Sequence, residues 1–299
     1  MNRLSVTFSL LFVFGLSYAQ QNLDTVKIKP IGVSEHVYML KGSGGNIGVL
    51  AGPDGILMID DQFAPLSNKI HAAIRAIDGH PLRFLINTHI HGDHSGGNEN
   101  FKNFGFTIVA HDQVRERMMQ SSTNDGKTVP PRPTDAWPVI SFPDKMSFHL
   151  NDEDIELLHF DRGHTDGDVI VRFKKANVYH TGDAFVRYGY PYIDINSGGS
   201  VNGFITTLDK LLGLLDDQSK VIPGHGEVGT KADVKALRDQ LADLRDQIVA
   251  ALKKGKKPEE IGGMPFASKY DVQLGSGFLK GKDFVTMMAN DLGSVQKQK

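Results

Sequence analysis

Short apolar runs, each bounded by glycine, proline or polar residues, recur along most of the chain. Runs of this length and composition are typical of β-strands. The pattern predicts strands over Val37–Leu40, Asn46–Leu50, Ile56–Asp60, Phe84–Thr88, Thr107–Ala110, Met146–Leu150, Ile155–Phe160, Val169–Phe173, Asn177–Thr181 and Lys220–Ile222.

Between these runs, apolar residues recur every three or four positions, which is the spacing of one face of an α-helix. The clearest case is Lys231–Lys253, preceded by Thr230, which resembles a capping box with Asp233. Its apolar repeat covers only two heptads, so we predict a helix packed on a sheet in preference to a coiled coil. The other predicted helices cover Pro65–Asp78, Asp112–Gln120, Val201–Leu215 and Lys282–Leu292.

Strands and helices alternate in both halves of the chain, after a few strands that follow one another directly. This order predicts an α/β protein in which two mixed sheets face each other and helices lie outside. Residues 20–299 contain no linker long enough to separate independent domains, so they are expected to form a single domain. Within it, residues 255–299 are interpreted as a C-terminal appendage.

One extended stretch, Ser121–Pro138, shows neither pattern and contains four prolines and Trp137, the only tryptophan. A loop of that length is usually a lid, a binding loop or a mobile surface segment. We expect it to border the substrate cleft, with Trp137 among the residues that line it.

The first residues have the three parts of a secretory signal peptide. Arg3 supplies a positive charge, Leu4–Leu16 is apolar, and Ser17-Tyr18-Ala19 is a small-x-small cleavage pattern. The alternative, a membrane anchor, needs an apolar stretch of about 20 residues, and this one is shorter. We therefore predict cleavage after Ala19, a secreted or periplasmic protein, and no membrane span in the mature chain.

The amino-acid composition limits which catalytic groups and metal ligands the chain can use. The 299 residues include 12 histidines and no cysteine, which excludes disulfides, thiolate catalysis and cysteine-ligated metals. Lys and Arg number 33 against 35 Asp and Glu, so a net charge of −2 gives no electrostatic reason to bind nucleic acid. A small-molecule substrate is expected, and any metal must be held by nitrogen and oxygen; the oligomeric state is left open.

The strongest signal is a cluster of histidines directly after the predicted strand Phe84–Thr88. His89, His91, Asp93 and His94 lie within six residues. As the chain leaves the strand, alternate side chains point to the same side, so His89 and His91 can converge. A turn at Gly92 can then place Asp93 and His94 near them. Neutral imidazole and carboxylate are the ligands that zinc accepts when thiolate is absent.

Three further residues of the same kind stand at predicted strand ends beside glycine. They are His164 in Arg162–Thr165, Asp183 after Asn177–Thr181, and His225 after Lys220–Ile222. Glycine lets the backbone turn sharply and approach closely. Active sites are commonly built from such loops on a rigid scaffold.

Together, His89-x-His91-x-Asp93-His94, His164, Asp183 and His225 resemble the metallo-β-lactamase superfamily of binuclear metallohydrolases. The resemblance extends over roughly residues 25–250 and implies an αββα sandwich with two metal ions at one edge of its sheets. By motif match, His89, His91 and His164 would hold the first metal, Asp93, His94 and His225 the second, and Asp183 would bridge them.

The resemblance also implies a support for the histidine loop. Asp60 matches an early aspartate of the family that contacts this loop without binding metal, and the adjacent Asp61 is the competing assignment.

Such a ligand set predicts hydrolysis. Two zinc ions can share a water, lower its pKa towards ~7 and deliver hydroxide to a carbonyl. Asp93 would be both ligand and catalytic residue, because its carboxylate can orient the hydroxide and relay a proton. Ser95 lies beside the cluster but lacks the Gly-x-Ser-x-Gly context of a nucleophile. Tyr188 and Tyr190 follow Asp183 closely and are candidates to line the pocket.

The substrate is left open among β-lactams, lactones and other esters or amides. Where Asp183 stands, well-known β-lactamases of the family usually carry cysteine or serine, so the carboxylate favours the lactonase and general hydrolase branches. The alternatives are a glyoxalase II-like thioesterase and a mononuclear iron persulfide dioxygenase, which keeps the histidine motif and would use iron. A non-catalytic metal-binding protein is disfavoured because all seven ligands are present.

Overall fold

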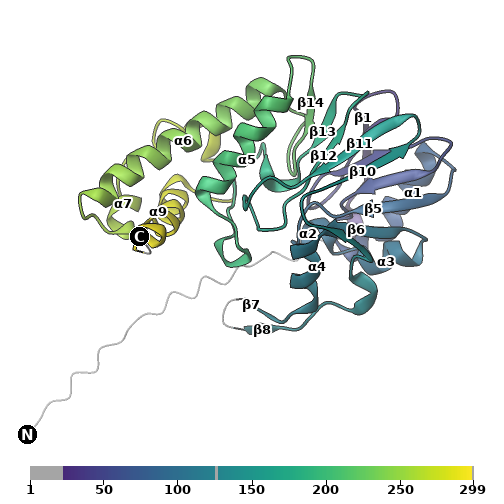
Figure 1. The fold of residues 1–299 in the computed structure, drawn as a ribbon, viewed down its shortest axis with the longest axis horizontal. Helices are drawn as coiled ribbons and strands as arrows, with labels where there is room; N and C mark the ends of the chain where they lie inside the picture. The colour runs from purple at the N-terminus through teal and green to yellow at the C-terminus, as the bar shows by residue number, and fades with distance from the viewer. Residues whose placement is uncertain (1–22, 125–126, 298–299) are drawn as a thin grey trace, which may run out of the picture.

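Most of the described strands form two sheets that pack face to face, with helices on both outer sides (Figure 1). The computed structural model describes residues 23–124 and 127–297, so the predicted signal segment lies outside the described residues. The seven-stranded sheet has the order β1 (Lys29–Gly32), β2 (Val37–Lys41), β3 (Ile47–Leu50), β4 (Ile56–Ile59), β5 (Leu82–Ile86), β6 (Thr107–His111) and β9 (Ile140–Phe142). The five-stranded sheet has the order β10 (Lys145–Leu150), β11 (Glu153–Leu158), β12 (Ile170–Phe173), β13 (Val178–His180) and β14 (Lys220–Ile222).

Both sheets are mixed. In the first, β1 to β4 pair antiparallel, whereas β4, β5, β6 and β9 are parallel. In the second, β10 to β13 pair antiparallel and β14 joins parallel to β13. The helices are α1 (Ser67–Ile77), α2 (Gly92–Ser95), α3 (Asn98–Asn103), α4 (Asp112–Met119), α5 (Val201–Leu214), α6 (Lys231–Lys253), α7 (Pro258–Gly262), α8 (Asp271–Leu274) and α9 (Gly281–Lys297).

Alternation along each strand separates the layers of the core. On β4, Leu57 and Ile59 face the second sheet, while Ile56 and Met58 pack with Ile70 of α1. Because side chains alternate between the two faces of a strand, a strand covered on both sides reads as a continuous apolar run. This explains why the apolar runs of the sequence located these strands.

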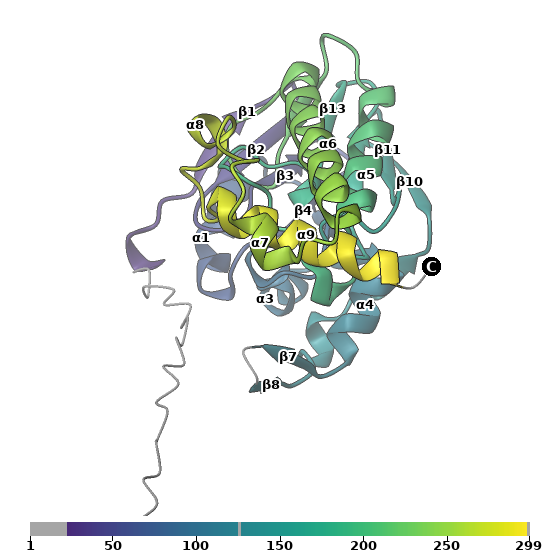
Figure 2. The same ribbon diagram turned by 90° about the vertical axis from the view of Figure 1, so that its left-hand side faces the viewer.

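The outer face of the second sheet is covered by the C-terminal half of the chain. Tyr179 of β13 and Val221 of β14 share a buried cluster with α5, α6 and α9. In Figure 2, α5 and α6 run beside each other and α9 passes across them. The predicted sandwich of two mixed sheets between helices is therefore what the chain forms.

Two expectations need correction. The long helix α6 packs mainly against α5 and α9, so its apolar stripe faces other helices where we had expected a sheet. The stretch Ser121–Pro138 is not wholly irregular, because it contains a two-stranded hairpin, β7 (Ser122–Asn124) with β8 (Lys127–Val129). The capping box of Thr230 and Asp233 forms as predicted.

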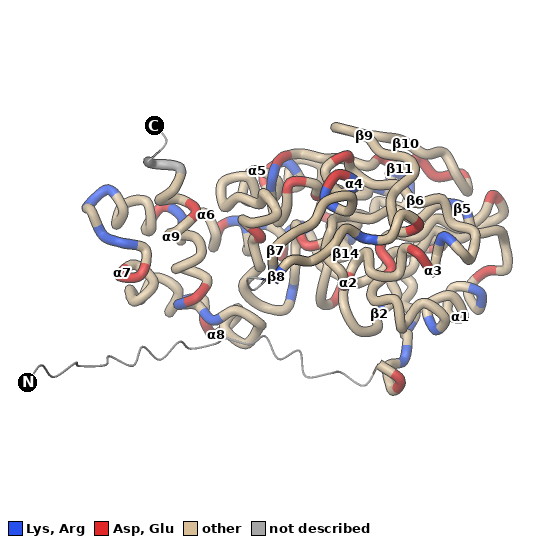
Figure 3. The backbone as a smooth tube through the Cα atoms, turned by 90° about the horizontal axis from the view of Figure 1, so that it is seen from below, with Lys and Arg blue, Asp and Glu red and all other residues tan. Residues whose placement is uncertain are grey.

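Charge is distributed over the surface without a dominant sign. Figure 3 shows basic and acidic residues interspersed along most of the chain, apart from a lysine-rich turn between α6 and α7. None of the described helices is long and apolar enough to cross a membrane.

Replacing Leu244 tests the helical layer. Leu244 of α6 is fully buried, so Leu244→Ala removes apolar contacts and leaves a cavity. We expect the free energy of unfolding to fall by about 2–5 kcal/mol in chemical denaturation. Val272→Ala is the control, because Val272 is 92% exposed. Equal stability of Leu244→Ala and the wild type would contradict this packing.

Candidate metal centre

Four chain segments deliver the predicted ligands to one edge of the two sheets. His89 follows β5, and α2 carries Asp93 and His94. His164 lies between β11 and β12, and His225 follows β14. His91 is the residue directly before α2, and Asp183 lies in a short 3-10 helix, Gly182–Ala184, after β13.

The structure brings all seven predicted ligands together in groups whose donor atoms lie within 4.8 Å of one another. One group is His89, His91 and His164, and another is Asp93, His94 and His225. These are the two sets that the family resemblance assigned to the first and second metal. A further grouping joins His89, His94 and Asp183.

Asp183 lies between the two groups. Its Oδ1 is 3.2 Å from His94 Nε2 and its Oδ2 is 3.7 Å from His164 Nε2. One carboxylate oxygen thus faces each group, which is the placement expected of a bridging ligand.

The residues fit a metal such as zinc. His91 Nδ1 and His164 Nε2 are 2.9 Å apart, and His94 Nε2 and His225 Nε2 are 3.2 Å apart. Two nitrogens on one tetrahedral zinc lie about 3.3 Å apart, given Zn–N bonds of about 2.0–2.1 Å. In addition, His89 Nε2 is buried with no hydrogen-bond partner among the described residues, which is costly unless a cation binds it.

Asp60 supports the ligand loop, residues 88–97, through contacts with Thr88 and His94. Its Oδ2 lies 2.7 Å from His94 Nδ1 and accepts a hydrogen bond from Thr88 Oγ1, while its Oδ1 accepts from Thr88 N at 2.7 Å. Asp60 adopts a positive φ of 62°, an uncommon conformation for a residue with a side chain. The adjacent Asp61 accepts from Gly97 N, so it binds the loop backbone and not a ligand ring.

Other ligand histidines are oriented by partners that the sequence analysis missed. His91 Nε2 lies 2.8 Å from Asp194 Oδ2, and His164 Nδ1 lies 2.7 Å from the carbonyl oxygen of Tyr192. Such contacts fix which ring nitrogen is free for metal. No spacing rule points to Asp194, which lies 103 residues from His91 and meets it only in the folded chain.

The surroundings shift the pKa values of the ligands in different directions. Burial, together with the neighbouring His91, lowers the pKa of His164 to about 4, so this imidazole is neutral and able to bind metal at neutral pH. Burial opposes ionisation of Asp93, but His94 and His225 outweigh it and lower the Asp93 pKa to about 2. Burial likewise opposes the charged form of His94, yet Asp183 and Asp60 hold its pKa well above the usual value.

The stretch Ser121–Pro138 is bound to the loop that carries the ligands by a half-buried arginine. Arg132 donates to the carbonyl oxygens of Ile90 and Ser95, each at 2.7 Å. Ser95 Oγ itself donates to the carbonyl oxygens of Ile90 and His91, so the hydroxyl has a structural role and not that of a nucleophile.

The three candidate substrate-lining residues have different places. Tyr188 lies edge-on to His225, with ring centroids 5.4 Å apart, so it borders the metal centre. Tyr190 does not line the site as we had expected, because it is fully buried and stacks on Phe284 of α9. Trp137 donates to the carbonyl oxygen of Arg132 and packs against the buried cluster of Ala110, Val114 and Met118, so it anchors its own segment.

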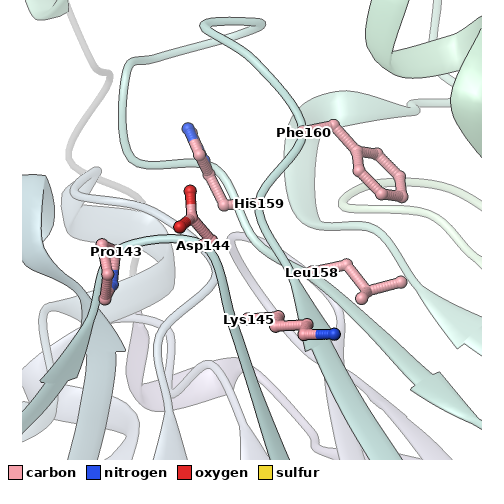
Figure 4. A pocket seen from close by; sticks show the side chains of 6 residues that line it. All are labelled: Pro143, Asp144, Lys145, Leu158, His159 and Phe160. Atoms are coloured by element: carbon pink, nitrogen blue, oxygen red, sulfur yellow. The ribbon is translucent and has the colours of Figure 1, made fainter.

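A separate hollow lies away from these ligands. It is lined by residues of the turn before β10 and the end of β11, including Asp144 and His159 (Figure 4). His159 stacks on His111 and its Nδ1 lies 2.8 Å from the carbonyl oxygen of Asp168. None of the seven predicted ligands lines this hollow.

Comparison with known proteins identifies the class. A model of the metallo-beta-lactamase superfamily matches residues 40–225, more than half of the chain. The chain therefore belongs to the metallo-β-lactamase superfamily, and the predicted family is confirmed.

The individual proteins that resemble this chain share a quarter or less of their residues with it over the matched regions. The acyl-coenzyme A thioesterase MBLAC2 of Gallus gallus is 25% identical over 229 residues, which are 66% of this chain and 79% of that protein. A metallo-beta-lactamase from Pontibacter korlensis is 15% identical with a TM-score of 0.60, covering 71% of this chain and 99% of that one. The DIM-1 metallo-beta-lactamase is 16% identical with a TM-score of 0.60, covering 73% and 98%. These structures confirm the predicted fold.

Asp168, behind His164, provides a pH-dependent test of the centre. Its Oδ1 accepts hydrogen bonds from Thr165 N at 3.0 Å and Thr165 Oγ1 at 2.5 Å. Burial outweighs these bonds and raises the Asp168 pKa from 3.8 to about 7. Between these values the folded chain binds a proton that the unfolded chain does not, so stability decreases as pH rises from about 4 to about 7.

Asp168→Asn should remove this dependence. In metal-free protein, we expect the wild type to lose on the order of 4 kcal/mol more than the variant across that pH interval, measured by denaturant unfolding. Asp152→Asn, at an exposed carboxylate, should follow the wild type. Parallel curves for wild type and Asp168→Asn would show that Asp168 is ionised in the folded chain throughout.

Proposed function

We propose that the protein is an exported, zinc-dependent hydrolase that cleaves a thioester, lactone, β-lactam or other ester or amide in a small-molecule substrate. The observation that carries the proposal is the pair of ligand groups joined by Asp183, with every donor a nitrogen or an oxygen. The groups His89, His91, His164 and Asp93, His94, His225 would hold zinc, which when bound would lower the pKa of water towards ~7 and polarise a carbonyl oxygen.

Asp93 is the residue that we assign to the chemical step. Its side chain is 28% exposed and therefore accessible to solvent, unlike the fully buried ring of His94. Because its pKa is about 2, the carboxylate stays ionised and can accept a hydrogen bond from the attacking water. Asp93 Oδ2 lies 3.2 Å from His225 Nε2, so the two donor atoms belong to the same ligand group.

Among carbonyl substrates, a thioester has specific support. MBLAC2 bears the name acyl-coenzyme A thioesterase, and its similarity covers 66% of this chain. The bridging position is a carboxylate, Asp183, and the chain has no cysteine to take that place. The competing function is an iron-dependent persulfide dioxygenase, which metal analysis and oxygen uptake with a persulfide distinguish from a zinc hydrolase.

Export rests on the pattern of Arg3, Leu4–Leu16 and Ser17–Ala19. When the full chain is expressed with its N-terminus intact in a bacterium, we expect it outside the cytoplasm, with a mature N-terminus at Gln20. N-terminal sequencing of each cell fraction measures this. Full-length protein beginning at Met1 and confined to the cytoplasm would contradict export.

Substitution of ligands tests the hydrolase. In Asp93→Ala and His225→Ala, we expect the second metal to be lost and hydrolysis to be abolished on a panel of β-lactams, lactones, thioesters and phosphodiesters. Metal content and initial rates are measured on the same preparations. His149→Ala is the matched control, because His149 is an exposed histidine on β10. Full activity in metal-free protein would refute the mechanism.

A further inference from the structure

The C-terminal appendage contacts the loop that follows Asp183, and residues 274–278 are the part of it that lies against the backbone of that loop. Its Leu274 carbonyl oxygen accepts a hydrogen bond from Tyr190 N at 3.2 Å. Tyr190 Oη also donates to Ala267 O at 3.1 Å and to Asp271 Oδ1 at 2.9 Å. The loop that follows Asp183 is thus bound to the appendage by two donors of one residue, the backbone N–H and the hydroxyl group of Tyr190.

Backbone contact between the two segments is unusually close. A Cβ at Gly277 would lie 2.6 Å from the Tyr188 carbonyl oxygen, and one at Gly189 would lie 2.8 Å from Gly277 Cα. Gly189 also has a φ of 148°, which favours glycine. Because only glycine fits at both positions, segment 274–278 is held at a fixed place against the loop.

That loop carries two tyrosines beside the ligands. Tyr188 lies against His225, and Tyr192 has its ring centroid 6.3 Å from that of His91 and 6.1 Å from that of His164. The two rings therefore flank both ligand groups.

Phe278 extends this aromatic surface outward. Its ring lies edge-on to Tyr192, with centroids 6.3 Å apart and an angle of 81°. The Phe278 side chain is 60% exposed, although it stands on a segment fixed by backbone contacts. An exposed aromatic ring on an ordered segment beside a reaction centre is suited to cover an apolar group of a ligand.

We propose that segment 274–278 forms the apolar wall of the substrate site, and that Phe278 selects substrates whose acyl group is a hydrocarbon chain. The selection of substrates by Phe278 rests on the proposed hydrolase function. The position of the wall rests on the contacts of residues 274–278 described above. The segment lies beyond residues 40–225, the part of the chain that matches the family model.

Acyl-chain selectivity tests the proposal. On the zinc-loaded enzyme, we expect Phe278→Ala to lower kcat/KM for octanoyl thioesters about tenfold through KM, and to leave acetyl thioesters unchanged. Phe278→Leu should restore most of the selectivity. Val272→Ala is the control, because Val272 is an exposed apolar residue of the same appendage. An equal effect on both chain lengths would overturn the proposal.

A binding measurement separates the wall from the reaction. Octanohydroxamate and acetohydroxamate share a metal-binding group and differ only in the hydrocarbon chain, so calorimetry reports the wall without catalysis. We expect the wild type and Val272→Ala to prefer octanohydroxamate, and Phe278→Ala to lose about tenfold of that preference. If no ester, thioester, lactone or amide is hydrolysed but the preference depends on Phe278, the hydrolase proposal fails and the wall stands. An unchanged preference in Phe278→Ala refutes the wall.

Discussion

Burial of histidine and aspartate side chains against one another is the constraint on which the rest of the structure depends. Ionisable groups removed from water cost free energy unless each has a fixed partner. Asp60 meets this requirement for His94, Asp194 for His91, and a backbone carbonyl for His164. The other ring nitrogens of these histidines face one another and have no such partner. A shared cation would bind them together.

The fold supplies that arrangement because two sheets end at the same edge. Strands β5, β13 and β14 each stop just before a ligand, and glycine allows the neighbouring backbone to approach. A Cβ at Gly45 would lie 2.1 Å from the ring of His94, and one at Gly224 would lie 1.9 Å from Asp183 Oδ1. The C-terminal helices join the same unit, since Tyr190 is buried in their cluster while its neighbours Tyr188 and Tyr192 lie beside ligands.

Apolar runs located most strands, and the His-x-His-x-Asp-His spacing located four of the seven candidate ligands, because both are local signals. The other three, His164, Asp183 and His225, came from their places beside glycine at predicted strand ends and from the family resemblance. The sequence patterns missed what depends on tertiary contact. Asp194 and Arg132 act on His91 and on the ligand loop across long chain separations, and no spacing marks them. Tyr190 was misplaced because a cluster of tyrosines does not reveal which ring turns into the core. The strands β1 and β9 were missed because their sequences, Lys-Pro-Ile-Gly and Ile-Ser-Phe, contain no continuous apolar run.

The most direct test of the centre is the position and number of its metal ions. Crystals of protein purified without chelator, measured at the zinc absorption edge, should show two anomalous peaks per chain. One is expected within His89, His91 and His164 and the other within Asp93, His94 and His225, with Asp183 between them. A single iron, or no metal at these residues, would contradict the account.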